Sequence, residues 1–438
     1  MPDNTTPRRS TFVSTVVRNE EGIIITSHRH GARPRAFALA WGCAALAVSV
    51  LPAAAWPRGA TVGGTPDNVD TGIRKNQCYS AGMNAMTSCD AADIPGQDGQ
   101  LGRDVDPATN SAGNGPLGLS FTRICNSGKA AGKGSCPKTP VLGDGPDDWG
   151  CVKDDLTKMM WEVKTITGFR AGDLKYTNYS VADDPFGEYG SPTDATGYVN
   201  AVNAARLCGY SDWGLAHTDK VQTILDYGIA TAGAARVDAN FFPDTDADWY
   251  WNDSPNLSSL FVAFAVNFAD GSASNDALRS TPRHVQVVRN AKASTGPGGR
   301  YEYSTDGAEV IGTAATARLT WRRCVEGMSW NGKSCTGTAL AFTHEQALQW
   351  AAQQALATGV AWRVPNVKEL GWIVDREEPS PTTRHDAFPA TPAEATWTST
   401  PEVRQPRAAW AVDFRFGLVT QRDRGERLVL RLARDSGG

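Results

Sequence analysis

The sequence is poor in the side chains and motifs on which most enzymes depend. Histidine occurs only 6 times in 438 residues. The four histidines beyond residue 55 are His217, His284, His344 and His385, and none has a partner at the spacing of a metal pair or a catalytic triad. The sequence contains no phosphate-binding loop, no dinucleotide-binding glycine motif and no helical His pair. We therefore predict that the protein is not an enzyme and assign no catalytic residue.

The chain also lacks an excess of positive charge. It carries 43 basic and 47 acidic residues, a formal charge of −4. Without residues 1–55 the counts are 37 and 44, a formal charge of −7. A bulk attraction to nucleic acid or to anionic membranes is therefore excluded. A local basic cluster between Arg422 and Arg434 is interpreted as a solvated strand face.

Long apolar runs are missing except near the N-terminus. Residues 1–35 are polar and carry three arginines close to their end, and an apolar run follows from Ala36 to Ala55. The run ends in three alanines, a pattern that signal peptidase accepts. We expect residues 1–55 to be a signal or targeting segment and the protein to be secreted, periplasmic or at the cell surface. The alternative is an uncleaved membrane anchor, since about 20 apolar residues span a bilayer. Membrane contact would then involve this segment alone.

The cysteines follow a pattern typical of exported proteins. Of 9 cysteines, all but Cys43 lie beyond residue 55. Three pairs lie eleven residues apart around Gly-, Asn- or Ser-rich stretches. The predicted disulfides join Cys78 to Cys89, Cys125 to Cys136, Cys151 to Cys208 and Cys324 to Cys335. Each would stabilise the fold by about 3 to 4 kcal/mol. A zinc site is the competing interpretation, but no CxxC occurs and histidine is sparse near these cysteines.

The strongest signal in the sequence is an internal repeat. The aligned blocks are 213–226 with 362–375, 242–271 with 388–417, and 285–290 with 430–435. None of the blocks contains a gap, and the offset between the copies falls from 149 to 146 and then to 145. Because three blocks keep their order, the chain contains two diverged copies of one domain.

Local patterns within the copies predict short helices and half-buried strands. Asn366 with Glu369, and Thr343 with Gln346, have the spacing of a capping box at a helix start. Val221, Ile224 and Leu225 form an apolar helical stripe, which the second copy repeats. Residues 264–268 and 410–414 alternate like strands. Together with 44 glycines and 25 prolines, these patterns predict an α+β class with short strands and two short helices in each loop-rich copy.

The repeat also predicts the domain organisation. We expect a targeting segment at 1–55, a Gly- and Asn-rich leading module with two disulfides at 56–138, the first copy at 139–290, a Gly/Pro/Ser linker at 291–299 and the second copy at 300–435.

Both copies resemble the family named for the C-terminal domain of the Legionella collagen-like adhesin, a bacterial family of extracellular domains. The matching strings include WGCVKDDLTKMMWEVKT from Trp149 and LCGYSDWGL from Leu207 in the first copy, and WRVPNVKEL and VDFRFG in the second. The first copy departs from the family in DWGLAHT, which lacks the Arg and Pro of the usual DWRLPT-like string. The resemblance implies attachment to host or matrix glycans at a cell surface. The WRVP string is also similar to the C-type-lectin-like fold, which we take as the expected architecture.

Two further sets of residues are candidates for ligand binding. Trp251, Asn252 and Asp253 resemble a calcium-coordinating string of C-type lectins. The metal candidates are Asp244, Asp246, Asp248 and Asp253. The second copy has Thr398 and Ser399 at the positions of Asn252 and Asp253, so we expect no cofactor, with calcium as the alternative. The aromatic candidates, which do not repeat between the copies, are Trp249, Tyr250, Trp330 and Trp372.

From these observations we predict an exported binding protein that recognises glycans or matrix components in the manner of an adhesin. Its partners would be a glycan or an extracellular protein, and not nucleic acid. A structural or assembly module of the cell envelope is the alternative, followed by an enzyme on a lectin-like scaffold.

Overall fold

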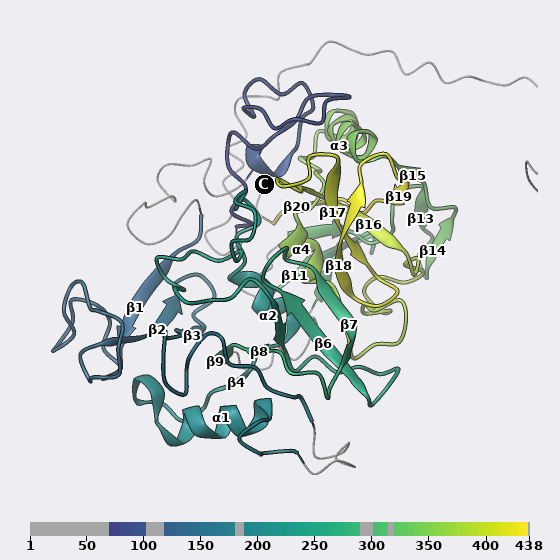
Figure 1. Cartoon of the computed structure of the whole chain (residues 1–438). Helices are drawn as coiled ribbons and strands as arrows, with labels where there is room; N and C mark the ends of the chain where they lie inside the picture. Colours follow the sequence, from purple (N-terminus) through teal and green to yellow (C-terminus); the bar gives the residue numbers. More distant parts are fainter. Residues whose placement is uncertain (1–69, 102–117, 180–187, 290–300, 314–318, 437–438) are drawn as a thin grey trace, which may run out of the picture. The chain divides into compact units, whose positions relative to one another are not determined.

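The computed structural model describes residues 70–101, 118–179, 188–289, 301–313 and 319–436 (Figure 1). The predicted targeting segment 1–55 and linker 291–299 lie outside these residues. Within the described ranges, none of the helices has the length and apolar character needed to cross a membrane.

The first copy is built from two sheets, and β1, which comes from the predicted leading module at 56–138, completes the outer one. The outer sheet has the strand order β1-β2-β3-β9-β4 and the inner sheet the order β7-β6-β5-β8. The strands are β1 (Phe121–Cys125), β2 (Trp149–Asp154), β3 (Met160–Glu162), β4 (Gly214–Leu215), β5 (Trp249–Trp251), β6 (Val262–Asn267), β7 (Ala273–Leu278), β8 (His284–Val285) and β9 (Val287–Arg289). The helices are α1 (Ala195–Ala204), the 3-10 turn η4 (Leu207–Gly209) and α2 (Thr218–Thr223).

The second copy repeats this arrangement with an added hairpin. Its outer sheet has the order β10-β11-β12-β20, its inner sheet the order β15-β19-β16-β17-β18, and β13 pairs with β14 alone. The strands are β10 (Tyr301–Tyr303), β11 (Glu309–Gly312), β12 (Leu319–Arg322), β13 (Met328–Trp330), β14 (Cys335–Gly337), β15 (Ala341–Phe342), β16 (Ala395–Pro401), β17 (Ala408–Asp413), β18 (Leu418–Asp423), β19 (Leu428–Val429) and β20 (Ala433–Asp435). The helices are α3 (His344–Thr358) and α4 (Val367–Gly371), and a 3-10 turn, η1 (Asp98–Gln100), precedes both copies.

Strand registers confirm that the two copies share one fold. Tyr250 pairs with Val266 on one side and with His284 on the other. Thr396, at the equivalent position, pairs in the same way with Val412 and Val429. The predicted capping boxes are also present: Asn366 caps α4 and Thr343 caps α3, each with its partner three residues on.

The predicted α+β, C-type-lectin-like architecture is wrong. The protein is mostly β, with 28% strand and 13% helix, and its four larger sheets are arranged like the blades of a small β-propeller. The prediction gave the helices too much weight because their caps are visible in the sequence. Helices α2 and α4 have only six and five residues. By contrast, β2 is buried on both faces and shows no alternation that would reveal a strand.

Disulfides brace the irregular parts, as predicted. They join Cys78 to Cys89, Cys125 to Cys136, Cys151 to Cys208 and Cys324 to Cys335. The Cys151–Cys208 bridge ties β2 to the turn η4, where Cys208 itself has the unfavourable positive φ of 50°.

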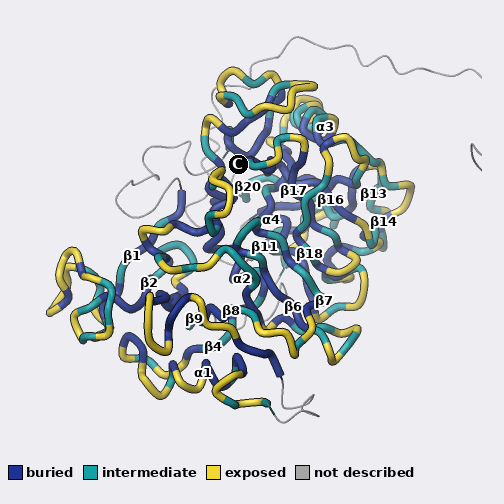
Figure 2. Tube along the Cα trace, viewed as in Figure 1, coloured by how far each residue is buried: buried dark blue, intermediate teal, exposed yellow. Residues whose placement is uncertain are grey.

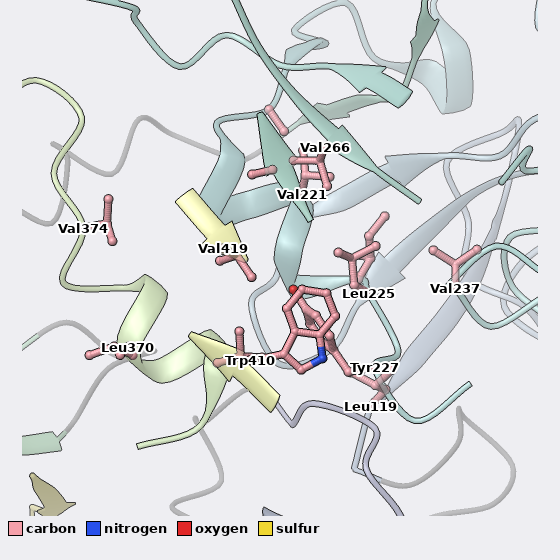
Figure 3. Close-up of a cluster of buried hydrophobic side chains, with 14 of the residues drawn as sticks. Leu119, Val221, Leu225, Tyr227, Val237, Val266, Leu370, Val374, Trp410 and Val419 are labelled. Carbon is pink, nitrogen blue, oxygen red and sulfur yellow. The ribbon is translucent and has the colours of Figure 1, made fainter. Parts of the chain in front are cut away.

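The two copies pack against each other through reciprocal contacts. Tyr227 of the first copy meets the Trp410 ring edge-on, with ring centroids 5.0 Å apart. Arg376, one residue beyond the aligned block and equivalent to Tyr227, lies 5.4 Å from the ring of Phe264, which is equivalent to Trp410. Tyr227 also donates a hydrogen bond to the carbonyl of Gly271, and Arg376 donates one to the carbonyl of the equivalent Gly417. One hydrophobic core therefore runs through both copies. Figure 3 shows Tyr227 and Trp410 surrounded by leucine and valine side chains of this core.

Buried polar groups complete the contact between the copies. Arg236 and Glu402 form an ion pair of 2.5 Å whose side chains are 0% and 1% exposed. Arg404 follows in the same loop and donates to three carbonyls of the first copy, those of Ile229, Ala234 and Ala269. The loop 402–407 therefore inserts into the first copy. Figure 2 shows the two short helices α2 and α4 as mostly buried.

The leading segment is docked by buried polar contacts as well. Lys368 of α4 donates to the backbone carbonyls of Asp70 and Thr223, so it links the segment to both copies. The Asp98 carboxyl is buried and accepts hydrogen bonds from Thr71 and Thr400. Burial is the main cause that raises the pKa of Asp98 to about 7, and it also lowers the pKa of Lys368 to about 8.

Breaking the ion pair between the copies should be strongly destabilising. Arg236→Ala leaves the Glu402 carboxylate buried without its cation, which should lower the free energy of unfolding by about 3 to 5 kcal/mol. The double variant Arg236→Met with Glu402→Leu should recover most of this loss. Urea unfolding measures both, with Arg407→Ala at the exposed Arg407–Asp423 pair as the control. Equal losses from Arg236→Ala and the control would contradict a role for the buried pair.

Asp98 should make stability depend on pH. Between about pH 4 and about pH 7 the folded protein holds a proton on Asp98 that the unfolded chain has lost, so the free energy of unfolding falls as the pH rises. Asp98→Asn should remove up to about 4 kcal/mol of this fall over the whole range, and about 3 kcal/mol of it between pH 5 and pH 8. The test compares urea unfolding at pH 5 and pH 8 in the wild type, in Asp98→Asn and in the exposed control Asp306→Asn. An unchanged difference in Asp98→Asn would show that the carboxyl stays ionised.

Candidate ligand-binding site

The two copies differ in chemistry at the edge where the inner sheet pairs β5 with β8. The first copy has Asp246, Asp248, Trp249, Tyr250, Arg283 and His284. The equivalent residues of the second copy are Pro392, Glu394, Ala395, Thr396, Leu428 and Val429. A scaffold position tends to keep its character between copies, whereas these positions are aromatic or charged mainly in the first. We call the first-copy set, together with Lys175, the first-copy polar site.

The backbone brings these residues together from three segments. The parallel pairing of β5 with β8 places Tyr250 beside His284. An isolated bridge between Tyr176 and Arg283 then brings the segment that carries Lys175 to the same edge. The Arg283 guanidinium lies 5.4 Å from the Trp249 ring, which is partly exposed.

His284 is the buried member of the site. Its side chain is 1% exposed and stacks on Tyr250, with ring centroids 5.0 Å apart. Its Nε2 atom lies 3.6 Å from the Asp246 carboxylate and 3.5 Å from that of Asp248, but neither ring nitrogen has a hydrogen bond of good geometry. Burial lowers the pKa of His284, and Lys175 adds to the effect. The imidazole is therefore neutral at physiological pH and can donate or accept a hydrogen bond.

The two carboxylates at the site have different surroundings. Asp248 accepts a hydrogen bond of 2.6 Å from Lys175 and another from its neighbour's backbone N–H. Burial acts to raise the pKa of Asp248, but these hydrogen bonds outweigh it and the pKa is lowered. Asp246 is 52% exposed and faces His284. The site thus offers acceptors, donors and an aromatic ring within one small area, and such convergent polar groups can fix the orientation of a small ligand.

The four predicted metal candidates do not form one site. Asp246 and Asp248 lie together at His284. Asp253 lies elsewhere, 3.6 Å from His217, and burial raises its pKa to about 6. Asp244 is exposed and has a positive φ of 54°. Across the described ranges, no group of three or more His, Cys, Asp or Glu side chains is arranged to hold a metal ion.

The four aromatic candidates also have different surroundings. Tyr250 is fully buried and stacks on Phe268, with ring centroids 4.1 Å apart, so it packs in the core behind the site and is not open to a ligand. Trp372 is covered by the Lys220 ammonium at 4.1 Å, at the contact between the copies. Trp249 and Trp330 are partly exposed, on the first-copy edge and on the β13–β14 hairpin respectively.

Sequence reasoning missed His284, Arg283 and Lys175 as members of the site. The first two lie immediately before the third aligned block, so extending that comparison by two residues would have set Arg283 and His284 against Leu428 and Val429. Lys175 gives no such signal, because only the tertiary bridge between Tyr176 and Arg283 brings it to Asp248.

A second titratable cluster in the first copy is closed to solvent. Lys164 lies 3.1 Å from Glu162 and donates to the Tyr198 hydroxyl, which in turn donates to Glu162. All three side chains are buried, and Tyr198 is supplied by α1. Burial lowers the pKa of Lys164 and raises that of Tyr198. The cluster holds α1 onto the outer sheet and offers no access for a ligand.

Comparison with known proteins places the chain in a family. No curated protein sequence matches the chain, and neither does any solved structure. The model of the Lcl C-terminal domain matches residues 150–289 and again residues 313–434. These two matches correspond to the two copies seen in the strand registers, and together they cover more than half of the chain. The protein therefore belongs to the Lcl C-terminal domain family of adhesin-like extracellular domains and carries two copies of that domain in tandem.

Proposed function

We propose that this protein is an exported adhesin-like binding protein that recognises a polysaccharide or a matrix glycan through the first-copy polar site. The observation that carries the proposal is the difference between the copies at this edge. Trp249, Asp246 and His284 stand where the second copy has alanine, proline and valine. A sugar ring can stack on the indole face while its hydroxyl groups bond the carboxylates and the cationic side chains.

We further propose that binding at this site needs neither a metal ion nor a chemical step. In support, Asp248 is already engaged by Lys175, and the eight described cysteines are all in disulfides, which removes thiol chemistry. Four disulfides also favour an oxidising compartment outside the cytoplasm.

A glycan array tests the function with the oxidised protein, in calcium and in chelator. Trp249→Ala should lower binding to the preferred glycan by about tenfold or more, because the stacking surface is lost. Asp246→Asn should weaken the same glycan by a smaller factor. Glu394→Gln at the second-copy position equivalent to Asp248 is the matched control and should bind like the wild type, as its copy lacks the rest of the site.

Three results would argue against parts of this proposal. Selective binding that survives Trp249→Ala would move the site elsewhere on the protein. Loss of binding in chelator would establish a metal requirement. The absence of binding to any glycan would leave the assembly function described next as the better proposal.

An assembly function is favoured by one apolar loop of the first copy. Leu257, Leu260 and Phe261 are 64%, 62% and 67% exposed, and Leu278 beside them is 54% exposed. The equivalent of Leu257 is Val403, which is 7% exposed because its loop inserts into the first copy. In the first copy, loop 402–407 is received by the segment between the first and second aligned blocks. The corresponding segment of the second copy, which would receive 256–261, is three residues shorter, because the offset falls from 149 to 146 there. This apolar loop is thus left for an external contact. We propose that the same loop of another molecule of this protein makes that contact.

Sedimentation velocity over a range of protein concentrations tests this alternative. If the loop mediates self-association, the wild type should dimerise and Phe261→Asp should remain monomeric, because a charge in an apolar contact is costly. Phe416→Asp, at an exposed phenylalanine of the second copy, is the matched control. A wild type that stays monomeric throughout the range would exclude the assembly function in this form.

A further inference from the structure

A second exposed aromatic surface lies on the second copy, away from the residues of the first-copy polar site. The Arg323 guanidinium lies 3.8 Å from the Trp330 ring and 4.5 Å from the Tyr303 ring. Tyr303 is 41% exposed and Trp330 is partly exposed. We call Tyr303, Arg323 and Trp330 the second-copy platform.

Hydrogen bonds from Arg323 to the backbone hold the platform in place. All three nitrogens of Arg323 donate to backbone carbonyls: Nε to Ala387 at 3.2 Å, Nη1 to Gly307 at 3.1 Å and Nη2 to Asp386 at 2.7 Å. Gly307 packs so close to the Trp330 ring that a Cβ atom there would lie 3.0 Å from the indole nitrogen, and its φ of +69° also suits glycine.

The hairpin that carries Trp330 is fixed as well. Trp330 pairs with Cys335 across β13 and β14, and Cys335 is bonded to Cys324, the residue after Arg323. A surface fixed in this way loses little side-chain entropy when it binds a ligand.

The described residues of the first copy form no equivalent of this platform. Trp161 and Trp321 occupy equivalent positions, since they pair with Val288 and Ala433, which are themselves equivalent. Two residues further on, Arg323 corresponds to Val163, which is 1% exposed in the core. The platform is therefore an addition to the second copy and not part of the shared scaffold.

We propose that the second-copy platform is a separate binding site for the ring of a neutral sugar within a polysaccharide. The C–H face of a sugar ring matches flat aromatic surfaces, and polar side chains at the rim, such as Lys333 and Asp386, are exposed next to it. Three of the five Arg323 N–H donors are engaged by backbone carbonyls and the guanidinium lies against both rings, so its main role is to brace them. Recognition is consequently by stacking, and it is insensitive to salt.

Affinity electrophoresis of the oxidised full-length protein tests the proposal. The gels contain a neutral polysaccharide (xyloglucan, galactomannan or hydroxyethyl cellulose) or heparin, with and without about 0.5 M NaCl, which screens exposed charges. Tyr303→Ala and Trp330→Ala should each weaken retardation by at least one neutral polysaccharide about tenfold or more. Tyr303→Phe and Trp330→Phe keep a ring and should retain most of the binding. They also separate loss of stacking from loss of folding, and Phe416→Ala is the control at another exposed aromatic residue.

The outcomes separate this site from the first-copy polar site. The second-copy platform is supported if retardation is insensitive to salt, depends on Tyr303 and Trp330, and survives Trp249→Ala. This result does not depend on whether the first-copy polar site binds a glycan. Retardation that Tyr303→Ala leaves unchanged, retardation by heparin alone that is lost in salt, or no retardation by any polysaccharide would each overturn it.

Discussion

The reciprocal contact between the two copies is the constraint on which the rest of the structure depends. Tyr227 packs on Trp410 and its equivalent Arg376 packs on Phe264, so each copy supplies one half of a shared core. Neither inner sheet could bury this face alone, because its hydrophobic residues would then remain in water. Duplication therefore produced one folding unit from two domains. The positions that make the contact are fixed by packing, and new chemistry has to arise outside them.

Charged groups buried at this contact make the mutual arrangement specific. Arg236 meets Glu402, and Lys368 reaches carbonyls in the leading segment and in the first copy. A buried charge without its partner costs far more than a misplaced apolar group, so a shifted packing of the copies is strongly disfavoured. The same groups show how the copies lost their symmetry. Loop 402–407 inserts its Glu and Arg into the first copy, while the equivalent loop 256–261 carries leucine and phenylalanine and stays outside.

Features that depend on nearby residues could be predicted from the sequence, and features that depend on tertiary contacts could not. The repeat, the two capping boxes and the disulfides follow from spacing along the chain, and the structure contains all of them. The α+β class was wrong because strands buried on both faces, such as β2, leave no periodic signal. At the site, Trp249 and two acidic residues could be named in advance. His284 could not, since its role depends on the parallel pairing of β8 with β5.

The two copies illustrate how one scaffold can acquire two different surfaces. In the first copy, the β5–β8 edge carries aromatic and titratable side chains where the second copy has mainly apolar ones, and the strand register is the same in both. In the second, a disulfide-bonded hairpin places Trp330 beside Arg323, and β10 places Tyr303 there. Since a shared core keeps the copies in a fixed relation, the two proposed sites, if both bind one long polymer, would act together, because the second contact forms at a high effective concentration. Tandem duplication is then advantageous for a binding protein even though neither site alone needs to be strong.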